Sequence, residues 1–407
     1  MDQKIFTITS INYLHKAEVL YKSVKSVNQN CDFTLVICDK KQEIPNFEKY
    51  FYNLDVIWAE DLFESNKKFK HFSFKFNVIE FNTLLKPIMF EILLKKYEQV
   101  IYLDPDIKVF NKLEFSQNYS IILTPHYTTS LNNWSKRPND LDLLRFGANN
   151  LGFICVNKTE ESNKFIHWWK NICHDYNFYE PSIGLGVDQK FIDLVPILFN
   201  NSIILKDLGM NLAFWNIHER NLIKKGNDYF VNDKIPLKFI HFSSFPINCP
   251  SKIADKQTIY NDYPNNIFKE IWEIYKNDLI TSSFYDLKNT PYSFNYFEDG
   301  MIINDFIRRN YVDFINKPDQ KWNNPFETNS NYRKNLKKNH IKLSKTNNTK
   351  INFKLVDENF SRIDRLFDFL FRTCLFVLGP YKYDLFTKYL NFKTISTKNK
   401  HESNSIS

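Results

Sequence analysis

The chain has 407 residues, of which 43% are hydrophobic and 25% are charged, a composition that excludes a mostly disordered protein. Residues 321–407 carry more than the whole net charge of +8, so residues 1–320 are slightly acidic. Because a surface that follows nucleic-acid phosphates needs a basic body, we expect no nucleic-acid binding by the main part of the chain.

The N-terminal residues and the cysteines indicate the cellular compartment of the protein. Residues 1–10 lack the basic and long apolar regions of a secretory signal, and no window offers the roughly 18 apolar residues of a membrane span. The six cysteines form no CxxC motif, which favours free thiols in a reducing compartment. We therefore expect a cytoplasmic protein.

The first predicted elements open an α/β sheet. Residues 4–9 have a strand pattern, residues 13–27 place apolar side chains at helical spacing, and residues 32–39 have a second strand pattern. Ligands of such sheets lie at the carboxyl ends of strands. We expect a pocket beside the residues that follow these two strands, namely Thr9, Ser10, Asn12, Tyr13 and Asp39.

Two carboxylates interrupt the apolar run QVIYLDPDIKVF, residues 99–110. A helix predicted within residues 81–99, with Pro87 in its first turn, leads into this strand. Asp104 and Asp106 would point the same way in a strand, and like charges so close destabilise each other unless a cation lies between them. Asp-Pro-Asp also suits a turn at a strand end, so a metal site and a simple turn remain alternatives at this point.

The later segments complete the predicted layout. Strands are expected at 120–126, 150–157 and 237–243, and helices at 160–176 and near 186–199. The predicted divisions are an α/β domain over 1–250, a helical extension packed on it over 251–320, a basic Asn- and Lys-rich linker over 321–352, and an amphipathic helical tail over 353–407. The apolar face of the tail comprises Phe360, Ile363, Phe367, Leu370, Phe371, Cys374 and Leu378.

Eight motifs in chain order resemble the GT-A class of nucleotide-sugar glycosyltransferases. More narrowly, they are similar to a bacterial family of polysaccharide biosynthesis enzymes related in layout to glycosyltransferase family 8. The resemblance covers residues 1 to about 315 and implies a Rossmann-like mixed sheet flanked by helices, with a helical C-terminal extension. The motifs are ITSINYL (8–14), LLKPIMFEILL (84–94), VIYLDPDIKVF (100–110), LTPH (123–126), NNLGFICV (149–156), GVDQKFIDLVP (186–196), GMNLAFWNIHER (209–220) and FIHFSSF (239–245).

The resemblance also implies a metal site. Asp104 and Asp106 would hold Mn²⁺ or Mg²⁺, which grips the donor diphosphate, and His241 would be the third protein ligand. Hard carboxylate oxygens suit either cation, and an imidazole beside them shifts the expectation toward Mn²⁺. A core or rim histidine is the alternative for His241.

Further roles follow from the same resemblance. Asp188 and Gln189 would lie at the reacting carbon, and Lys86, expected at a helix start where a cation needs an anionic partner, would contact a phosphate. The alternatives are a solvated Lys86, a turn residue at Asp39, a helix cap at Asp188 and a core or turn histidine at His126. The implied donor-binding residues are Thr9, Asn12, Tyr13, Asp39, Lys86, Asn149, Asn150 and Gly152. The implied acceptor-side residues are His126, Asn211, Trp215, Asn216 and Arg220.

The implied activity is transfer of a sugar, with retention, from a nucleoside-diphosphate donor, UDP-sugar favoured, to a surface polysaccharide or lipid-linked glycan. A catalytically silent glycan- or nucleotide-binding protein at the membrane is one alternative. A haloacid-dehalogenase-type phosphatase is another, although that class places its Asp-x-Asp motif near the domain start. The basic, amphipathic tail could hold the protein on the anionic inner face of the cytoplasmic membrane, or it could pack on protein.

Overall fold

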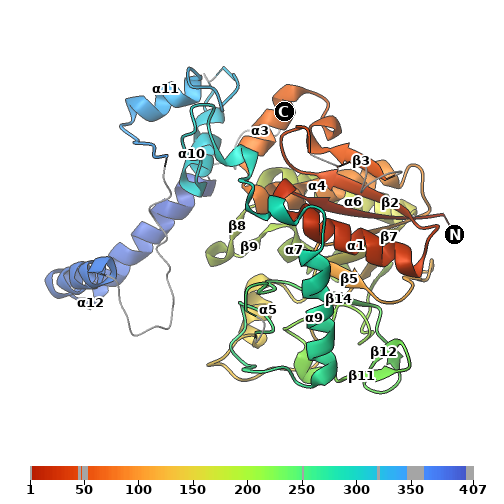
Figure 1. Ribbon diagram of the computed structural model, residues 1–407. Helices are drawn as coiled ribbons and strands as arrows, with labels where there is room; N and C mark the ends of the chain where they lie inside the picture. The colour runs from red at the N-terminus through yellow and green to blue at the C-terminus, as the bar shows by residue number, and fades with distance from the viewer. Residues whose placement is uncertain are drawn as a thin grey trace. The chain divides into compact units, whose positions relative to one another are not determined.

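The computed structural model describes residues 2–44, 47, 54–249, 252–318, 321–345 and 362–399, with only the backbone described for 362–365, 368 and 391–399. The chain divides into two compact units, Met1–Phe294 and Asn295–Ser407 (Figure 1). Within the described helices, no segment is both long enough and apolar enough to cross a bilayer.

A seven-stranded mixed sheet forms the centre of the first unit. Its strand order is β10-β6-β7-β4-β1-β2-β3, in which β7 runs antiparallel to β4 and β6 while the remaining neighbours pair in parallel. The predicted α/β class with a mixed sheet is confirmed. The strands are β1 (Gln3–Thr9), β2 (Asp32–Ile37), β3 (Asp55–Trp58), β4 (Gln99–Leu103), β6 (Ile121–Leu123), β7 (Phe153–Asn157) and β10 (Ser202–Ile204).

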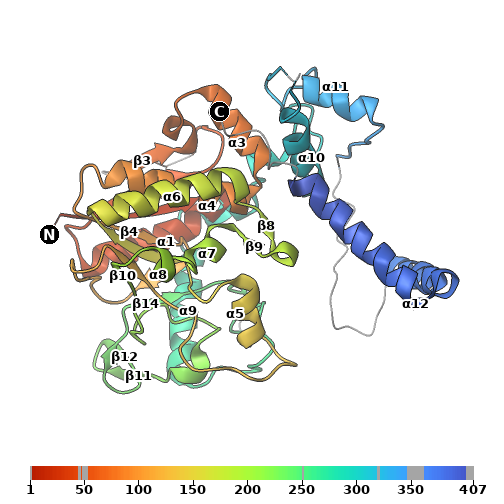
Figure 2. The same cartoon turned by 180° about the vertical axis from the view of Figure 1, so that it is seen from behind.

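Helices cover both faces of this sheet. Helix α1 (Leu14–Val27) lies on one face, and α4 (Val78–Leu93) and α6 (Glu160–Tyr176) lie side by side on the other (Figures 1 and 2). All five residues of β4 are buried, as expected for a strand covered on both sides. The other α-helices in the described part of this unit are α3 (Asn66–Lys75), α5 (Asp140–Phe146), α7 (Val187–Ile192), α8 (Val195–Leu198) and α9 (Asn266–Ile280).

A smaller layer beside the main sheet brings distant segments together. Strand β5 (Ile107–Val109) leaves the Asp-Pro-Asp turn and pairs antiparallel with β14 (Phe239–His241). The apolar side of β14 shares a core cluster with α9. This cluster contains Ile240 of β14 and Trp272 of α9. The remaining strands are β8 (Tyr179–Glu180), β9 (Leu185–Gly186), β11 (Leu222–Lys225), β12 (Asp228–Val231) and β13 (Ile235–Pro236).

The start of α4 corrects a prediction. The helix begins at Val78, because Asn77 caps the amides of Ile79 and Glu80 while the Glu80 carboxylate accepts from the Asn77 amide. Pro87 therefore lies inside the helix and not in its first turn. The expectation that Lys86 stands at a helix start, where the dipole disfavours a cation, was wrong.

The second unit contains α10 (Asp305–Ile315), α11 (Asn331–Lys338) and α12 (Arg362–Asn399). Helix α11 falls in the predicted linker, so the linker prediction was wrong there. Tyr332 and Leu336, four residues apart, are buried, and the Tyr332 hydroxyl donates to the Ile307 carbonyl at 2.6 Å. Two apolar anchors at helical spacing outweighed the polar composition around them.

Helix α12 consists of two segments joined at Gly379, whose φ of 69° is left-handed. Of the predicted apolar face, Phe360 lies outside the described residues, and Phe367, Leu370 and Phe371 are exposed. Phe369 and Phe376, on the face expected to be polar, are exposed as well, by 65% and 90%. The helix therefore presents apolar side chains on more than one face.

Candidate metal and donor site

Asp104 and Asp106 lie in the turn between β4 and β5. The turn is fixed from two sides, because the Asp104 amide donates to the Gly152 carbonyl and the Phe242 amide donates to the Asp106 carbonyl, both at 2.8 Å. Strand ends of the main sheet and of the β5–β14 pair therefore meet at these two residues. The turn and the metal site, alternatives from the sequence, are compatible in the structure.

His241 completes a cluster of three candidate ligands. Pairing of β14 with β5 places His241 opposite Ile107, and its Nε2 lies 3.1 Å from Asp106 Oδ1 and 3.7 Å from Asp104 Oδ2. One ligand atom from each residue lies within 4.8 Å of the others. Two carboxylates and an imidazole form a donor set that suits Mn²⁺, so the residues present fit the predicted ion.

The electrostatics of the cluster favour positive charge at its centre. Burial raises the pKa of Asp106, but the neighbouring His241 outweighs it and the net pKa is lowered. Burial lowers the pKa of His241, whereas Asp106 and Asp104 raise it, and the net pKa is raised. A divalent cation between these groups would offset the negative charge of the two carboxylates.

Two residues that the sequence analysis missed support the aspartates. The Tyr102 hydroxyl donates to Asp104 Oδ1 at 2.6 Å, and the Lys16 ammonium lies 3.8 Å from Asp106 Oδ2 and 4.1 Å from the centre of the Tyr13 ring. Tyr102 precedes Asp104 by two residues in an extended segment, and this period of two could have identified it. No pattern in the sequence singled out Lys16.

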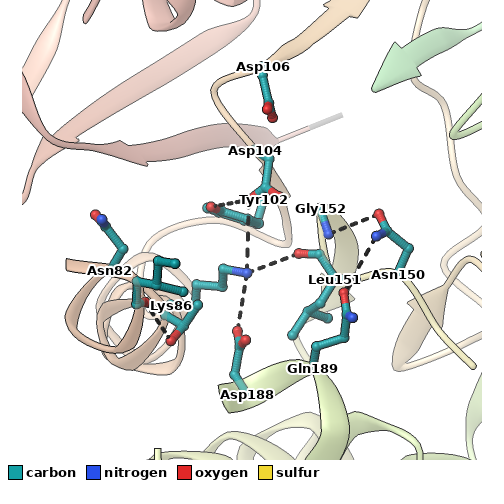
Figure 3. A network of polar contacts seen from close by, with 12 residues as sticks. Asn82, Lys86, Tyr102, Asp104, Asp106, Asn150, Leu151, Gly152, Asp188 and Gln189 are labelled. Atoms are coloured by element: carbon teal, nitrogen blue, oxygen red, sulfur yellow. Dashed lines mark hydrogen bonds and ion pairs between the residues drawn. The ribbon is translucent and has the colours of Figure 1, made fainter. Parts of the chain in front are cut away.

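Lys86 connects the aspartates to Asp188. Its buried ammonium donates to the Leu151 carbonyl at 3.0 Å and lies 3.1 Å from Asp188 Oδ2 and 4.0 Å from Asp104 Oδ1 (Figure 3). Burial raises the pKa of Asp188 to about 6 although Lys86 opposes the shift. The alternative of a solvated lysine is thus wrong, and Asp188 lies within the first turn of α7, whose N-cap residue is Gly186.

Gln189 is held by backbone groups on both sides. Its Oε1 accepts from the Leu151 amide at 3.0 Å, and its Nε2 donates to the Phe146 carbonyl at 2.8 Å. The side chain is therefore oriented before any ligand arrives. Figure 3 shows that Gln189 reaches from α7 to Leu151, whereas Asp188 reaches from the same helix to Lys86.

The residues after β1 and β2 differ in accessibility. Tyr13 is exposed, whereas Thr9 is buried and Asn12 accepts from the Ser10 hydroxyl at 2.6 Å. Asp39 is 1% exposed and accepts from the amides of Ile11, Lys40 and Ser293. Burial raises the pKa of Asp39. The Asp39 carboxylate therefore fixes the loop after β1, and Tyr13 is the one exposed residue among those predicted to follow β1 and β2.

The segment before β7 lies directly against the cluster. Asn150 contacts His241 and His126, while the Asn149 side chain donates to Asp193 Oδ1 at 3.2 Å. Gly152 allows close approach, because a Cβ at this position would lie 2.5 Å from His241 Cε1. Glycine is thus required here by space.

Of the predicted acceptor-side residues, two lie at the cluster. The centre of the Trp215 ring lies 5.2 Å from the ring centres of both His126 and His241, and both rings meet it edge to face. Asn216 instead binds backbone groups, donating to the carbonyls of His126 and Asn211 at 2.8 Å. Arg220 is buried beside Glu219, at 3.5 Å, and also donates to the Met210 carbonyl, so its contacts stabilise the loop. Asn211 is fully buried with a left-handed φ of 53°.

Two proteins of Bacillus subtilis strain 168 are similar in sequence to this chain. No family model matches the chain. The chain is 23% identical over 265 residues to YfnF, an uncharacterized protein of Bacillus subtilis strain 168, a match that covers 63% of this chain and 87% of YfnF. It is 26% identical over 296 residues to YfnD, an uncharacterized protein of the same strain, with 66% and 89% covered.

Among solved structures, the chain is similar to that of the galactosyltransferase LgtC in complex with donor and acceptor sugar analogues. The identity is 14%, the TM-score is 0.41, and the match covers 68% of this chain and 96% of LgtC.

Proposed function

We propose that this chain is a metal-dependent GT-A glycosyltransferase that moves a sugar, with retention, from a nucleoside-diphosphate donor to a surface polysaccharide or lipid-linked glycan. A UDP-sugar is the favoured donor. The observation that carries the proposal is the cluster of Asp104, Asp106 and His241, whose ligand atoms lie within 4.8 Å of one another. The cluster follows the carboxyl end of central strand β4, the edge where α/β sheets bind ligands.

Several side chains beside the cluster suit a diphosphate and its nucleoside. Bound Mn²⁺ or Mg²⁺ would offset the diphosphate charge and stabilise the departing nucleoside diphosphate. Lys86, 4.0 Å from Asp104, and Lys16, 3.8 Å from Asp106, add positive charge at the same place. The exposed ring of Tyr13 is available to stack on the base.

Asp188 and Gln189 are proposed to act at the sugar. The bond between the anomeric carbon and the diphosphate oxygen breaks, the acceptor hydroxyl oxygen bonds to the same carbon, and its proton passes to the departing diphosphate. Gln189 Oε1 accepts from the Leu151 amide at 3.0 Å and from Asn150 Nδ2 at 3.5 Å, and an amide oxygen fixed in this way stabilises positive charge that develops on the sugar. Asp188, paired with Lys86, adds negative charge on the same side.

A panel of nucleoside-diphosphate sugars tests the proposal. The full chain is incubated with Mn²⁺ and each donor, and released nucleoside diphosphate is measured. We expect release from at least one UDP-sugar, and loss of about 100-fold or more in Asp106→Ala, because a metal ligand is removed. Asp228→Ala, which changes an exposed carboxylate of β12, is the matched control and should retain activity.

The same experiment identifies the silent alternative. If no donor is hydrolysed or transferred, and Asp106→Ala binds donors as tightly as the unchanged chain, the protein is a binding module and the proposal is wrong.

A further inference from the structure

Asn150 lies between two histidines, one of which is a candidate metal ligand. Its Oδ1 is 3.2 Å from the Gly152 amide and 3.2 Å from His241 Nδ1, and its Nδ2 is 3.2 Å from His126 Nε2. Asn150 and His241 are both buried. The resemblance implied donor binding for Asn150, and in the structure both ends of its amide have protein partners.

The hydrogen bonds determine where each proton lies. A backbone amide can only donate, so the Gly152 amide fixes Oδ1, and not Nδ2, on the side that faces His241. An amide oxygen can only accept, so His241 must carry a proton on Nδ1. The opposite ring nitrogen, Nε2, lies 3.1 Å from Asp106 Oδ1, so with Nδ1 occupied by its proton Nε2 is the atom that can bind a cation beside the carboxylate.

The other end of Asn150 is consistent with this assignment. Nδ2 can only donate, so His126 Nε2 must accept, and the His126 proton lies on Nδ1, which is 3.4 Å from the Ala148 carbonyl. Acceptance requires a neutral His126, and burial lowers the pKa of His126 to about 4. The Trp215 ring contacts both imidazoles at 5.2 Å and limits their rotation.

Space at Gly152 restricts the arrangement further. A Cβ at Gly152 would lie 2.5 Å from His241 Cε1 and 2.9 Å from Asn150 Oδ1. Only glycine therefore lets the Asn150 oxygen and the His241 ring approach the same backbone amide.

We infer that Asn150 is a positioning residue that fixes His241 as the Nδ1–H tautomer, so that Nε2 is directed at the metal. The inference rests on the proposed metal site. Outer partners of this kind set the tautomer and orientation of metal-binding histidines, and their loss commonly weakens metal affinity ten- to 100-fold.

Mn²⁺ titration of the full chain, followed by the electron paramagnetic resonance of free Mn²⁺, tests the inference. We expect the dissociation constant to rise about ten- to 100-fold in Asn150→Ala. Asn150→Asp keeps an oxygen that accepts from His241 and Gly152, so its constant should stay within about three-fold. The control Asn82→Ala removes an amide on α4 that donates to the Val78 carbonyl and should bind Mn²⁺ unchanged.

Solvent exchange of the His241 ring protons, followed by nuclear magnetic resonance, separates this inference from the metal proposal. In metal-free protein we expect the Nδ1 proton to exchange about ten-fold more slowly in the unchanged chain than in Asn150→Ala, because its bond to Asn150 Oδ1 protects it. Equal Nδ1 proton exchange and equal Mn²⁺ affinity in the two proteins overturn the inference. A chain whose Nδ1 proton is protected but which binds no Mn²⁺ overturns the metal proposal alone.

Discussion

The first unit and helix α12 of the second unit distribute their apolar side chains in opposite ways. In the first unit Phe153 is fully buried between the rings of Phe115 and Phe239, and charged groups meet at one edge of the sheet. In the second unit α12 exposes Phe376 by 90% and Val377 by 73%. In the first unit, the polar site is thus held in place by a well-packed apolar core. Helix α12 instead carries apolar surface that the described part of its own unit does not cover.

Paired phenylalanine substitutions test this contrast most strongly. Phe153→Ala should lower the free energy of unfolding by about 3–5 kcal/mol, because it leaves a cavity in the core. Phe376→Ala should change it by less than about 0.5 kcal/mol. Urea unfolding followed by tryptophan fluorescence measures both. Equal losses would show that Phe376 is packed in the folded protein and would remove the contrast.

Paired lysine substitutions compare a buried ion pair with an exposed one. Lys86→Met leaves the buried Asp188 without its cation and should cost about 3–5 kcal/mol at pH 8. Lys388→Met removes the exposed pair with Asp384 and should cost less than about 0.5 kcal/mol.

The cost of Lys86→Met should also depend on pH. Burial already raises the pKa of Asp188 to about 6, and loss of Lys86 raises it further, so Asp188 becomes neutral at pH 5 and the cost shrinks. Urea unfolding at pH 8 and pH 5 measures the change. A cost that is the same at both values contradicts this account.

His15 gives the first unit an acid sensitivity. Burial, with a contribution from Lys16, lowers the pKa of His15 to about 4 from its ordinary 6.5. Between pH 7 and pH 5 the unfolded chain therefore takes up a proton that the folded chain does not, and stability should fall by about 1–2 kcal/mol from this residue. His15→Gln should flatten the pH dependence by that amount in urea unfolding. An unchanged slope would assign the acid sensitivity to other groups.

Vesicle binding tests whether the exposed apolar side chains of α12 contact a membrane. The double variant Phe369→Glu with Phe376→Glu should bind phosphatidylglycerol vesicles roughly ten-fold more weakly than the unchanged chain, because exposed apolar area is lost. Thr373→Glu with Thr387→Glu adds the same charge to the same helix and is the matched control. Equal weakening by both pairs would indicate charge repulsion alone, and no weakening by either would favour packing on protein.

Much of the secondary structure of the first unit could be predicted from the sequence, because its apolar residues recur at regular helical or strand spacing. Strand β1, helix α1 and helix α6 begin and end within about a residue or two of the predicted positions. Short strands such as β8 and β9 carry too few residues to show a period, and they were not predicted. The capping box at Asn77 and Glu80 was readable, but the proline at position 87 was given more weight.

Part of the candidate metal site could also be predicted from the sequence, for a different reason. Asp104 and Asp106 stood out because carboxylates interrupted an apolar run, whereas His241 required a resemblance, since the pairing of β5 with β14 leaves no local signal. Lys16 and the histidine-binding role of Asn150 depend on distances between separate segments, which no local pattern contains.

The origin of the three candidate ligands in two chain segments links ion capture to folding. Unfolded polypeptide offers only the local Asp104-Pro105-Asp106 pair, and the imidazole arrives when β14 docks on β5. An ion that binds the three assembled ligands more tightly than the two aspartates alone must stabilise the pairing of β14 with β5. The stabilisation equals the difference between the two binding free energies. Mn²⁺ would therefore slow proteolysis between β13 and α9, a property visible without any sugar substrate.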